Sequence, residues 1–314
     1  GEAVARGAVA VLCERPLDLP VTRVEVAEVR RAVGPIAAAS HAHPSADLAV
    51  LGVTGTNGKT TVTHLLEAIA GAGGRRVGVI GTLGARVGGD AVPVGFTTPE
   101  APDLQALLAT MRDRGVDTVA MEVSSHALAL HRVDGTRFAA TCFTNLTHDH
   151  LDFHGSMDDY LAAKARLFTP DFTARAAVNT DDPHGPALAE RARRDGLEVT
   201  TFGFGAEADV SARAVEPGPD GTRLTLVLRT SGEEHDARLA LLGRLNVANA
   251  LAAAATAGAA GFGPAEVLAG LAAAPTVPGR LERVDAGQDF ALLVDYAHTP
   301  DALDRKSTRL NSSH

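Results

Sequence analysis

Short apolar runs alternate with amphipathic segments along most of this 314-residue chain. Over residues 47–275, each apolar run has the length of a buried strand, and the segment after it repeats apolar residues every three to four positions, as a helix does. This alternation is typical of an α/β fold with a mostly parallel sheet. Residues 208–242 differ, because polar and apolar residues alternate there. They predict antiparallel strands with a hairpin turn at 218–221.

Breaks in the pattern divide the chain into parts. Pro44 marks the first boundary, and Pro275 and Pro278 mark the second. Apolar periodicity is lost after Asp304, so we expect the last domain to be truncated and the tail to be foreign or disordered. The parts are the end of an N-terminal α/β domain (1–46), a central domain (47–275), the start of a C-terminal domain (276–304) and the tail (305–314).

Two helix boundaries follow from residues that break or cap helices. A short helix over 26–33 should be broken at Gly34-Pro35, because proline removes a backbone donor and crowds the preceding turn. A second helix, over 102–114, should take Thr98 as its N-cap, because a threonine hydroxyl accepts hydrogen bonds from the free N–H groups of the first turn.

A glycine-rich turn follows the strand predicted at 48–53. Strand, turn and helix in this order direct backbone N–H groups at one point, which suits a phosphate, although an ordinary strand-to-helix loop is the alternative. Lys59 supplies a charge for the outer phosphates and Thr60 a hydroxyl for Mg²⁺. The strict P-loop pattern is missed, because Val53 takes the place of its first glycine. The predicted phosphate-binding residues are Gly55, Thr56, Asn57, Gly58, Lys59, Thr60 and Thr61.

Other polar side chains come at the ends of predicted strands. Glu122 lies at the end of the run 117–123, and Ser124 follows it. Asn145 follows the strand predicted at 138–143. Because ligands of open parallel sheets bind at the carboxyl ends of the strands, we expect these side chains to share a site with the phosphate loop.

Residues 147–154 hold three histidines and two aspartates. This density predicts a divalent metal site, and Mg²⁺ or Mn²⁺ shared with a nucleotide fits better than zinc, because no cysteine accompanies the cluster. The alternative is a polar loop whose side chains cap the next helix, predicted at 157–168. That helix carries Lys164.

Lysine is rare in this chain. Of 29 Lys and Arg residues, only Lys59, Lys164 and Lys306 are lysine. Arginine cannot replace a lysine that must react as a neutral amine, so composition alone makes Lys164 a candidate functional residue. Its chance survival on a helix surface is the alternative.

Bulk properties exclude several classes of function. The formal net charge of −9 argues against nucleic-acid binding through the phosphate backbone. No apolar run has the length of a membrane span, and no signal peptide is visible. Two cysteines form no disulfide framework, so we expect a cytoplasmic protein. The oligomeric state leaves no trace in the sequence.

Taken together, these motifs resemble the Mur ligase family, and within it the branch that adds the third residue of the peptidoglycan stem peptide. The matching segments follow the family's order over nearly the whole chain. They are residues 55–61, 97–99, 121–126, 131–133, 143–146, 149–155, 162–164, 246–249, 279–282 and 294–301.

The resemblance implies three domains: one for the uridine nucleotide, a central P-loop ATPase and a Rossmann-like domain that closes over ATP. It implies that ATP phosphorylates the D-glutamate carboxylate of UDP-MurNAc-L-Ala-D-Glu, and that a diamino acid, meso-diaminopimelate or L-lysine, attacks the acyl phosphate. ATP and two Mg²⁺ sites are the implied cofactors. Without a complete closing domain, the fragment is expected to be weak or inactive alone.

The resemblance also assigns roles to residues. Lys59, Glu122, His150 and Lys164 are the implied catalytic residues. Thr60 and Glu122 would serve the first metal and His150 a second, and a carbamylated Lys164 would also be able to bind Mg²⁺. Asn246, Asn249, Arg280 and Asp295 would join the phosphate loop in binding ATP. Thr97, Thr98, Ser124 and Arg132 would bind the muramoyl dipeptide.

One departure and two alternatives stay open. Leu130 stands where the family often has glutamine, which puts one substrate contact in doubt. The chain ends before the loop that selects the amino acid, and only its Ala- and Arg-rich composition, typical of a GC-rich bacterium, favours diaminopimelate. A ligase of the folylpolyglutamate or cyanophycin type and a P-loop module without ligase chemistry are the rival functions.

Overall fold

The computed structural model describes residues 1–218, 221–284, 286–288, 290 and 292–297. Its strands are β1 Ala10–Cys13, β2 Thr22–Glu25, β3 Ala49–Thr54, β4 Val77–Gly81, β5 Gly84–Val87, β6 Asp90–Val92, β7 Thr118–Glu122, β8 Ala140–Phe143, β9 Arg175–Asn179, β10 Glu198–Phe202, β11 Val210–Gly218, β12 Gly221–Leu228, β13 Glu233–Leu239, β14 Glu282–Val284 and β15 Leu292–Val294. Its helices are α1 Glu2–Ala5, α2 Val29–Ser40, the 3₁₀ helix η1 Pro44–Ala46, α3 Lys59–Ala72, α4 Ala101–Asp113, α5 Ser125–Ala129, α6 Leu151–His154, α7 Met157–Ala165, α8 Gly185–Arg194, α9 Arg244–Ala259 and α10 Pro264–Ala273.

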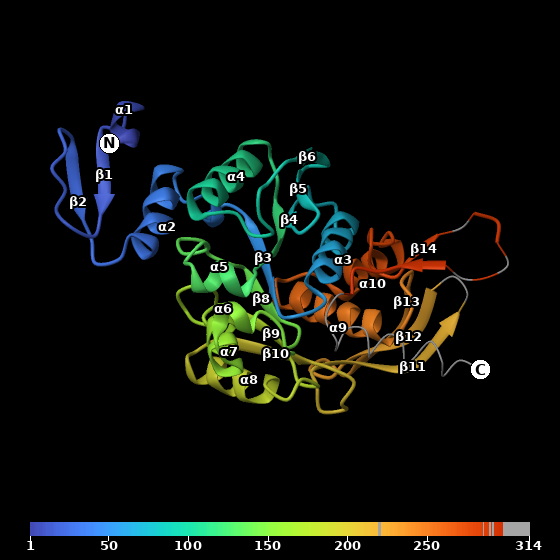
Figure 1. Ribbon diagram of the computed structural model, residues 1–314. Coiled ribbons are helices and arrows are strands. Elements are labelled where there is room, and N and C mark those ends of the chain that lie inside the picture. The colour runs from blue at the N-terminus through green and yellow to red at the C-terminus, as the bar shows by residue number, and fades with distance from the viewer. Residues whose placement is uncertain (219–220, 285, 289, 291, 298–314) are drawn as a thin grey trace.

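One large sheet organises the molecule (Figure 1). It has 11 strands in the order β13-β12-β11-β10-β9-β8-β3-β7-β4-β5-β6. The strands from β11 to β4 are parallel, and antiparallel strands extend the sheet at both ends. The prediction of a mostly parallel α/β sheet is therefore confirmed, and β3, which precedes the phosphate loop, lies between β8 and β7.

Helices cover both faces of the sheet because its central strands are apolar on both sides. In β3, Leu51 and Val53 face a core that α3, α9 and α10 complete, whereas Val50 faces a second core under α4, α7 and α8. Successive side chains of a strand point to opposite faces, so one short apolar run supplies both cores. The carboxyl ends of these strands are thereby fixed in one row.

The predicted break at Gly34-Pro35 is wrong. Helix α2 runs through Pro35 without interruption. Proline removes one intrahelical hydrogen bond, and packing compensates for this loss, because α2 lies against α4 and its Ala38 is buried. At Gly34 the helix comes so close to the Asp134 carbonyl that a Cβ would overlap it.

The predicted N-cap of the helix at 102–114 is also wrong. Helix α4 begins at Ala101, its N-cap is Glu100, and Pro102 occupies its first turn. The Thr98 hydroxyl instead donates to the Glu122 carbonyl at 2.9 Å. The Thr98 hydroxyl makes a tertiary hydrogen bond instead of the helix cap that the local sequence predicted.

The segment 208–242 forms the antiparallel strands that its pattern predicts. β12 pairs with β11 and with β13, and the β11–β12 hairpin closes with Gly218 opposite Gly221. β14 and β15 pair in a separate antiparallel ribbon. The predicted tail, 305–314, lies outside the described residues, as do residues 298–304 of the predicted C-terminal part.

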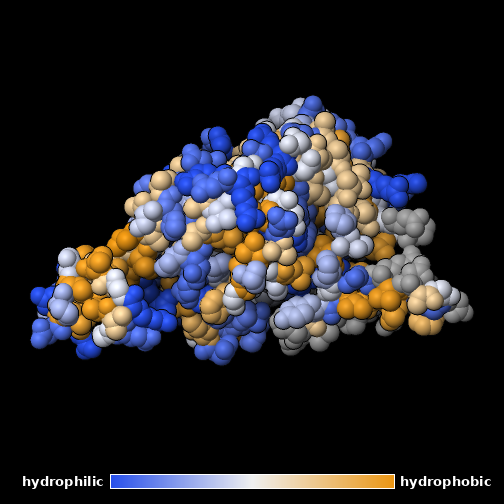
Figure 2. All heavy atoms as spheres, turned by 90° about the horizontal axis from the view of Figure 1, so that it is seen from above, coloured by the Kyte–Doolittle hydropathy of each residue, from blue (hydrophilic) through white to orange (hydrophobic). Residues whose placement is uncertain are grey.

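Apolar side chains also reach the surface. Figure 2 shows them on the N-terminal part, at the left of the view, where Val9, Val24 and Ile36 are exposed. Among the described residues, no helix combines the length and the apolar character that crossing a membrane requires.

Candidate active site

The phosphate loop joins β3 to α3 and includes Gly58, the N-cap of α3. Gly58 has a φ of 89°, in the left-handed region that glycine adopts at no steric cost. A Cβ at this position would lie 2.5 Å from Asn249 Oδ1 on α9. The positive φ therefore favours glycine here, and a Cβ would also displace the Asn249 amide.

Lys59 is folded back over the loop. Its Nζ donates hydrogen bonds to the carbonyl oxygens of Gly55, at 2.8 Å, and Thr56, at 2.9 Å. Burial lowers the pKa of Lys59, the nearby Glu122 carboxylate raises it, and the Arg280 guanidinium lowers it. The ammonium group thus lies at the loop, where phosphate oxygens can replace the two carbonyls as acceptors.

The end of β8 braces the loop through Asn57. The Asn57 N–H donates to Asn145 Oδ1 at 2.9 Å, and the Asn57 carbonyl accepts from Asn145 Nδ2 at 3.1 Å. The Thr144 hydroxyl donates to the same carbonyl at 2.6 Å. The predicted neighbourhood of Asn145 and the phosphate loop is present, with the two segments joined by side-chain hydrogen bonds.

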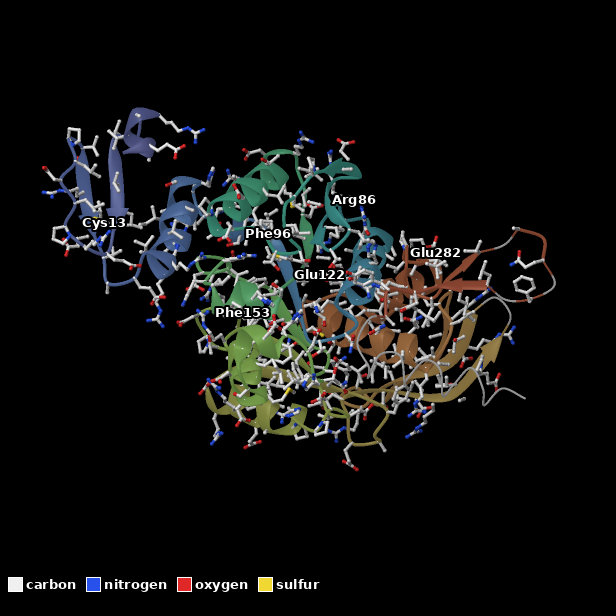
Figure 3. All side chains as sticks on the ribbon, viewed as in Figure 1. Cys13, Arg86, Phe96, Glu122, Phe153 and Glu282 are labelled. Carbon is white, nitrogen blue, oxygen red and sulfur yellow. The ribbon has the colours of Figure 1, made fainter. Side chains whose placement is uncertain are left out.

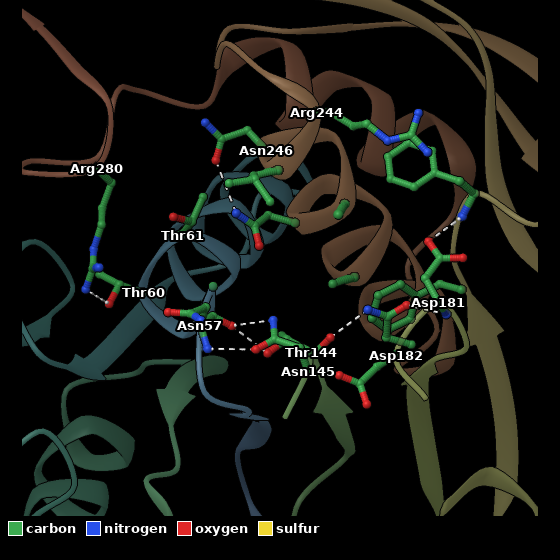
Figure 4. A pocket seen from close by; sticks show the side chains of 18 of the residues that line it. Asn57, Thr60, Thr61, Thr144, Asn145, Asp181, Asp182, Arg244, Asn246 and Arg280 are labelled. Carbon is green, nitrogen blue, oxygen red and sulfur yellow. Dashed lines mark hydrogen bonds between the residues drawn. The ribbon is translucent and has the colours of Figure 1, made fainter. Parts of the chain in front are cut away.

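A cavity of about 380 Å³ opens beside the loop (Figure 4). Arg280 crosses to it and donates to the Thr60 hydroxyl at 3.1 Å. Asp295 accepts from the N–H groups of Leu281 and Ala297, at 2.8 and 2.7 Å, and so holds the turn that carries Arg280. The predicted ATP-binding residues that line this cavity are Asn57, Gly58, Thr60, Thr61, Asn246, Asn249, Arg280 and Asp295.

The wall opposite the phosphate loop was not predicted. There the Arg244 guanidinium lies 3.8 Å from the centre of the Phe204 ring, and the Phe204 N–H donates to Asp181 Oδ2 at 2.8 Å. Asn179 joins this wall to β8, because its Nδ2 donates to the Thr144 carbonyl at 2.7 Å. Asn179 is the last residue of β9, and this position at a strand end could have identified it as a site residue from the sequence. Arg244 and Phe204 belong to no motif.

Glu122 lies at the carboxyl end of β7, near the centre of the molecule (Figure 3). It is 1% exposed. The Thr82 N–H donates to its Oε1 at 2.8 Å, and the Thr82 hydroxyl donates to its Oε2 at 3.1 Å. In the described part of the chain, no Lys, Arg or His nitrogen lies within 4.0 Å of this carboxylate. A buried anion without a cation is costly, so the site favours a positive partner.

The predicted substrate residues are joined to Glu122. The Thr98 hydroxyl accepts from the Ser124 N–H at 3.1 Å while donating to the Glu122 carbonyl. Arg132 donates to the Thr98 carbonyl at 3.3 Å and pairs with Glu100 at 2.8 Å. The structure therefore brings Thr98, Ser124 and Arg132 into one hydrogen-bonded cluster around the end of β7.

Lys164 is 1% exposed, so its place on α7 is not a solvated helix surface. Its Nζ lies 4.3 Å from the centre of the Tyr160 ring. Burial sets the pKa of Lys164 well below its ordinary value, and the Lys59 charge lowers it further, whereas Asp149 raises it. Lys164 and Lys59 are therefore close enough to influence one another's charge.

Tyr160, which was not predicted, lies next to Lys164, and His154, from the segment predicted to bind a metal, contacts Tyr160. The Tyr160 hydroxyl lies 3.1 Å from Thr56 Oγ1, which connects α7 to the phosphate loop. His154 stacks on the Tyr160 ring with 4.8 Å between ring centres, and its Nε2 lies 2.9 Å from Ser125 Oγ. Burial, and then the charges of His126 and Lys164, lower the pKa of His154 to about 4.

His150 is the N-cap of α6 and is half exposed. Its ring lies 4.8 Å from the ring of His126, and its Nε2 lies 3.4 Å from Asp149 Oδ2. Within the described residues, no group of three or more His, Cys, Asp and Glu side chains is arranged to hold a metal ion. The metal site predicted from the density of His and Asp at 147–154 is therefore not formed by these side chains alone. The ligand sets that the resemblance implies differ, because they include a threonine hydroxyl and a modified lysine.

The parallel sheet, the phosphate loop and the cavity beside it define a P-loop nucleotide-binding protein of the α/β class. The Mur ligase middle-domain family matches this chain over residues 53–257. The chain therefore belongs to the Mur ligase family. The resemblance expected from the motifs is thus confirmed.

Curated relatives agree with this placement. The chain is 46% identical over 96% of its length to the UDP-N-acetylmuramoyl-L-alanyl-D-glutamate–2,6-diaminopimelate ligase of Streptomyces avermitilis. It is 45% identical over 95% of its length to the ligase of the same name from Geobacter metallireducens. The chain spans 60% and 59% of the length of these two proteins, which is about three fifths of each.

Solved structures share the fold. A structure of a UDP-N-acetylmuramoyl-L-alanyl-D-glutamate–2,6-diaminopimelate ligase superposes with a TM-score of 0.84 at 29% identity, over 98% of this chain and 63% of that one. A folylpolyglutamate synthase of Mycobacterium tuberculosis gives a TM-score of 0.73 at 20% identity, over 90% and 70% of the two chains, which shows a common fold alone.

Proposed function

We propose that this chain is the nucleotide-binding part of an ATP-dependent ligase that joins a diamino acid to UDP-MurNAc-L-Ala-D-Glu. The observation that carries the proposal is the position of Glu122. Its backbone carbonyl binds Thr98 of the substrate cluster, while the charge of its carboxylate acts on Lys59 of the phosphate loop. The residues that would hold an acceptor and a phosphoryl donor therefore meet at one point.

The chemistry requires such a meeting. A carboxylate is a poor electrophile, so an oxygen of the D-glutamate carboxylate first attacks the γ-phosphorus of ATP, and ADP leaves. The amine of the diamino acid then attacks the acyl carbon, loses a proton, and expels inorganic phosphate as the amide bond forms. Lys59 would neutralise charge on the transferring phosphoryl group, and Thr97, Thr98, Ser124 and Arg132 would hold the dipeptide.

The residues present also fit Mg²⁺. Glu122 is a buried carboxylate without a cationic side chain within 4.0 Å among the described residues, and Lys59 and Thr60 place the phosphate loop beside it. Thr60 and Glu122 would hold the first ion, and His150 and a carbamylated Lys164 the second. When bound, Mg²⁺ would neutralise charge on the phosphate oxygens of ATP while the phosphoryl group is transferred.

Diaminopimelate is the proposed amino acid, because the relatives at 45–46% identity carry it in their names. The choice of L-lysine is the alternative. We further propose the division at residues 46, 275 and 304, since the matched segment 53–257 falls within the central part, and a cytoplasmic location for the enzyme.

The decisive experiment measures acceptor-dependent release of ADP by the full-length protein. Every mixture contains ATP and Mg²⁺. Two mixtures add UDP-MurNAc-L-Ala-D-Glu with either meso-diaminopimelate or L-lysine, and a third adds a folate and L-glutamate instead of the dipeptide and the diamino acid. ADP release only with the muramoyl dipeptide and diaminopimelate is expected. Release with the folate would support the folylpolyglutamate-type alternative, and nucleotide binding without release in any mixture would support a non-catalytic module.

A further inference from the structure

We propose that Thr82 is a positioning residue that fixes the Glu122 carboxylate for a divalent cation, an inference that rests on the proposed ATP-dependent function. Thr82 donates two hydrogen bonds to this one carboxylate. Its N–H reaches Oε1 at 2.8 Å and its hydroxyl reaches Oε2 at 3.1 Å. Both oxygens are therefore held by a single residue, and the plane of the carboxylate is set with them.

The contact is built into the sheet. β4 and β7 are neighbouring parallel strands that pair as far as Ile80 and Met121. The next residues, Gly81 and Glu122, therefore lie side by side where the two strands end. The Glu122 side chain packs against Gly81 so closely that a Cβ there would overlap Oε1. A glycine followed by a threonine thus forms a cradle for the carboxylate.

Charge explains why a cradle is needed. Hydrogen bonds to an ionised carboxylate are about twice as strong as neutral ones, and two of them offset part of the cost of burying Glu122. They leave its negative charge in place. Residues that hold a metal ligand in this way commonly change metal affinity by about 10- to 100-fold when removed.

Thr82 also reaches the proposed dipeptide site. Its Oγ1 lies 3.4 Å from the Oγ1 of Thr97. The single hydroxyl proton of Thr82 goes to Glu122, so in this pair the Thr97 hydroxyl is the donor. A polar chain therefore runs from Thr97 through Thr82 to Glu122.

Binding of Mn²⁺ to the ADP complex, followed by electron paramagnetic resonance, tests the proposal without turnover. Thr82→Val removes the hydroxyl but keeps the shape and the N–H. We expect the Kd for Mn²⁺ to rise by about tenfold or more, and Thr82→Ser to restore it. Affinity for ADP without metal should not change. Thr82 is exposed, so these variants leave the core intact.

Thr110→Val is the matched control, because among the described residues the Thr110 hydroxyl bonds only within α4, to the Ala106 carbonyl. An unchanged Mn²⁺ affinity in Thr82→Val would overturn the proposal, as would a serine variant no better than valine. If Glu122→Gln also binds Mn²⁺ normally, the metal lies elsewhere and the role of Thr82 is refuted with it. If Thr82→Val weakens Mn²⁺ binding as expected but the unsubstituted protein releases no ADP with any acceptor, only the proposed ligase function is refuted.

Discussion

The ammonium nitrogen of Lys164 lies 4.3 Å from the centre of the Tyr160 ring, and the hydroxyl of the same ring lies 3.1 Å from Thr56 Oγ1 in the phosphate loop. One aromatic residue thereby joins a buried lysine to the nucleotide site. No carboxylate of the described residues comes within 4.0 Å of the Lys164 ammonium group. Burial therefore favours the neutral amine, the form that reacts with carbon dioxide.

Lys164 should carry a carbamate. With ¹³C-labelled carbon dioxide, we expect a carbamate carbon signal in the NMR spectrum of the protein, and we expect Lys164→Arg to remove it. Because burial lowers the pKa of Lys164, the signal should persist at a pH where exposed lysines are fully protonated. Lys59→Arg is the control and should keep the signal. A signal that survives in Lys164→Arg would refute the assignment.

Much of the fold follows from local pattern. β3, the phosphate loop and α3 were predicted to within a few residues, because a buried strand, a glycine turn and an amphipathic helix each leave a short-range signature. The errors arose where a distant residue decided the local structure. Helix α2 packs against α4 and continues past Pro35. The Thr98 hydroxyl bonds the Glu122 carbonyl and therefore does not cap α4.

The candidate site divides in the same way. Residues in the loops after strands could be predicted, because the carboxyl ends of parallel strands converge whatever their order in the sheet. Thr82 also follows a strand, β4, but nothing in the sequence indicates that its hydroxyl turns toward Glu122. Arg244 and Phe204 meet only because α9 packs across the end of β10, a contact between segments that no local pattern encodes.

Gly58→Ala should damage both stability and nucleotide binding. A left-handed φ costs an L-residue about 1–2 kcal/mol, and the new Cβ would also press on Asn249. Gly74 is the matched control, since it too has a left-handed φ, of 73°, but nothing lies within 4 Å of its Cβ position. Gly74→Ala should lower the free energy of unfolding alone, whereas Gly58→Ala should also weaken ADP binding. Equal ADP affinities in the two variants would contradict this account of the loop.

Asp209 should make stability depend on pH. Burial would raise the pKa of Asp209, but hydrogen bonds from the Thr201 N–H and hydroxyl and from Arg229 outweigh it, and the pKa lies below its ordinary value of 3.8. The unfolded chain therefore binds a proton more readily than the folded protein. The stabilisation is present above about pH 4 and is lost as the pH falls through the lower folded pKa.

Chemical denaturation of Asp209→Asn from pH 7 to pH 3 tests this linkage. At pH 7 the variant should be less stable by about 1.5–3 kcal/mol, the usual contribution of a hydrogen bond to a charged group. The difference from the unsubstituted protein should shrink as the pH falls below 4. A difference that stays constant with pH would show that the charge of Asp209 does not contribute.

Arg132 should bind the dipeptide rather than the nucleotide. Its guanidinium lies 4.4 Å from the centre of the Phe96 ring and pairs with Glu100, and its Nε is buried without a hydrogen-bond partner in the described structure. An unsatisfied buried donor favours an incoming acceptor. We therefore expect Arg132→Ala to raise the KM for UDP-MurNAc-L-Ala-D-Glu by about tenfold or more, while the KM for ATP stays the same.

Arg137→Ala supplies the comparison in the same steady-state assay of the full-length protein. Arg137 also caps backbone carbonyls, those of Pro170 at 2.8 Å and Asp171 at 2.9 Å, but it belongs to no part of the site. Its loss should leave both KM values unchanged. If Arg132→Ala raised both values equally, the side chain would be supporting the fold around β7. Because the hydrogen-bond, ion-pair and ring partners of Arg132 among the described residues are Thr98, Glu100 and Phe96, a selective change in the dipeptide KM is the outcome that this geometry requires.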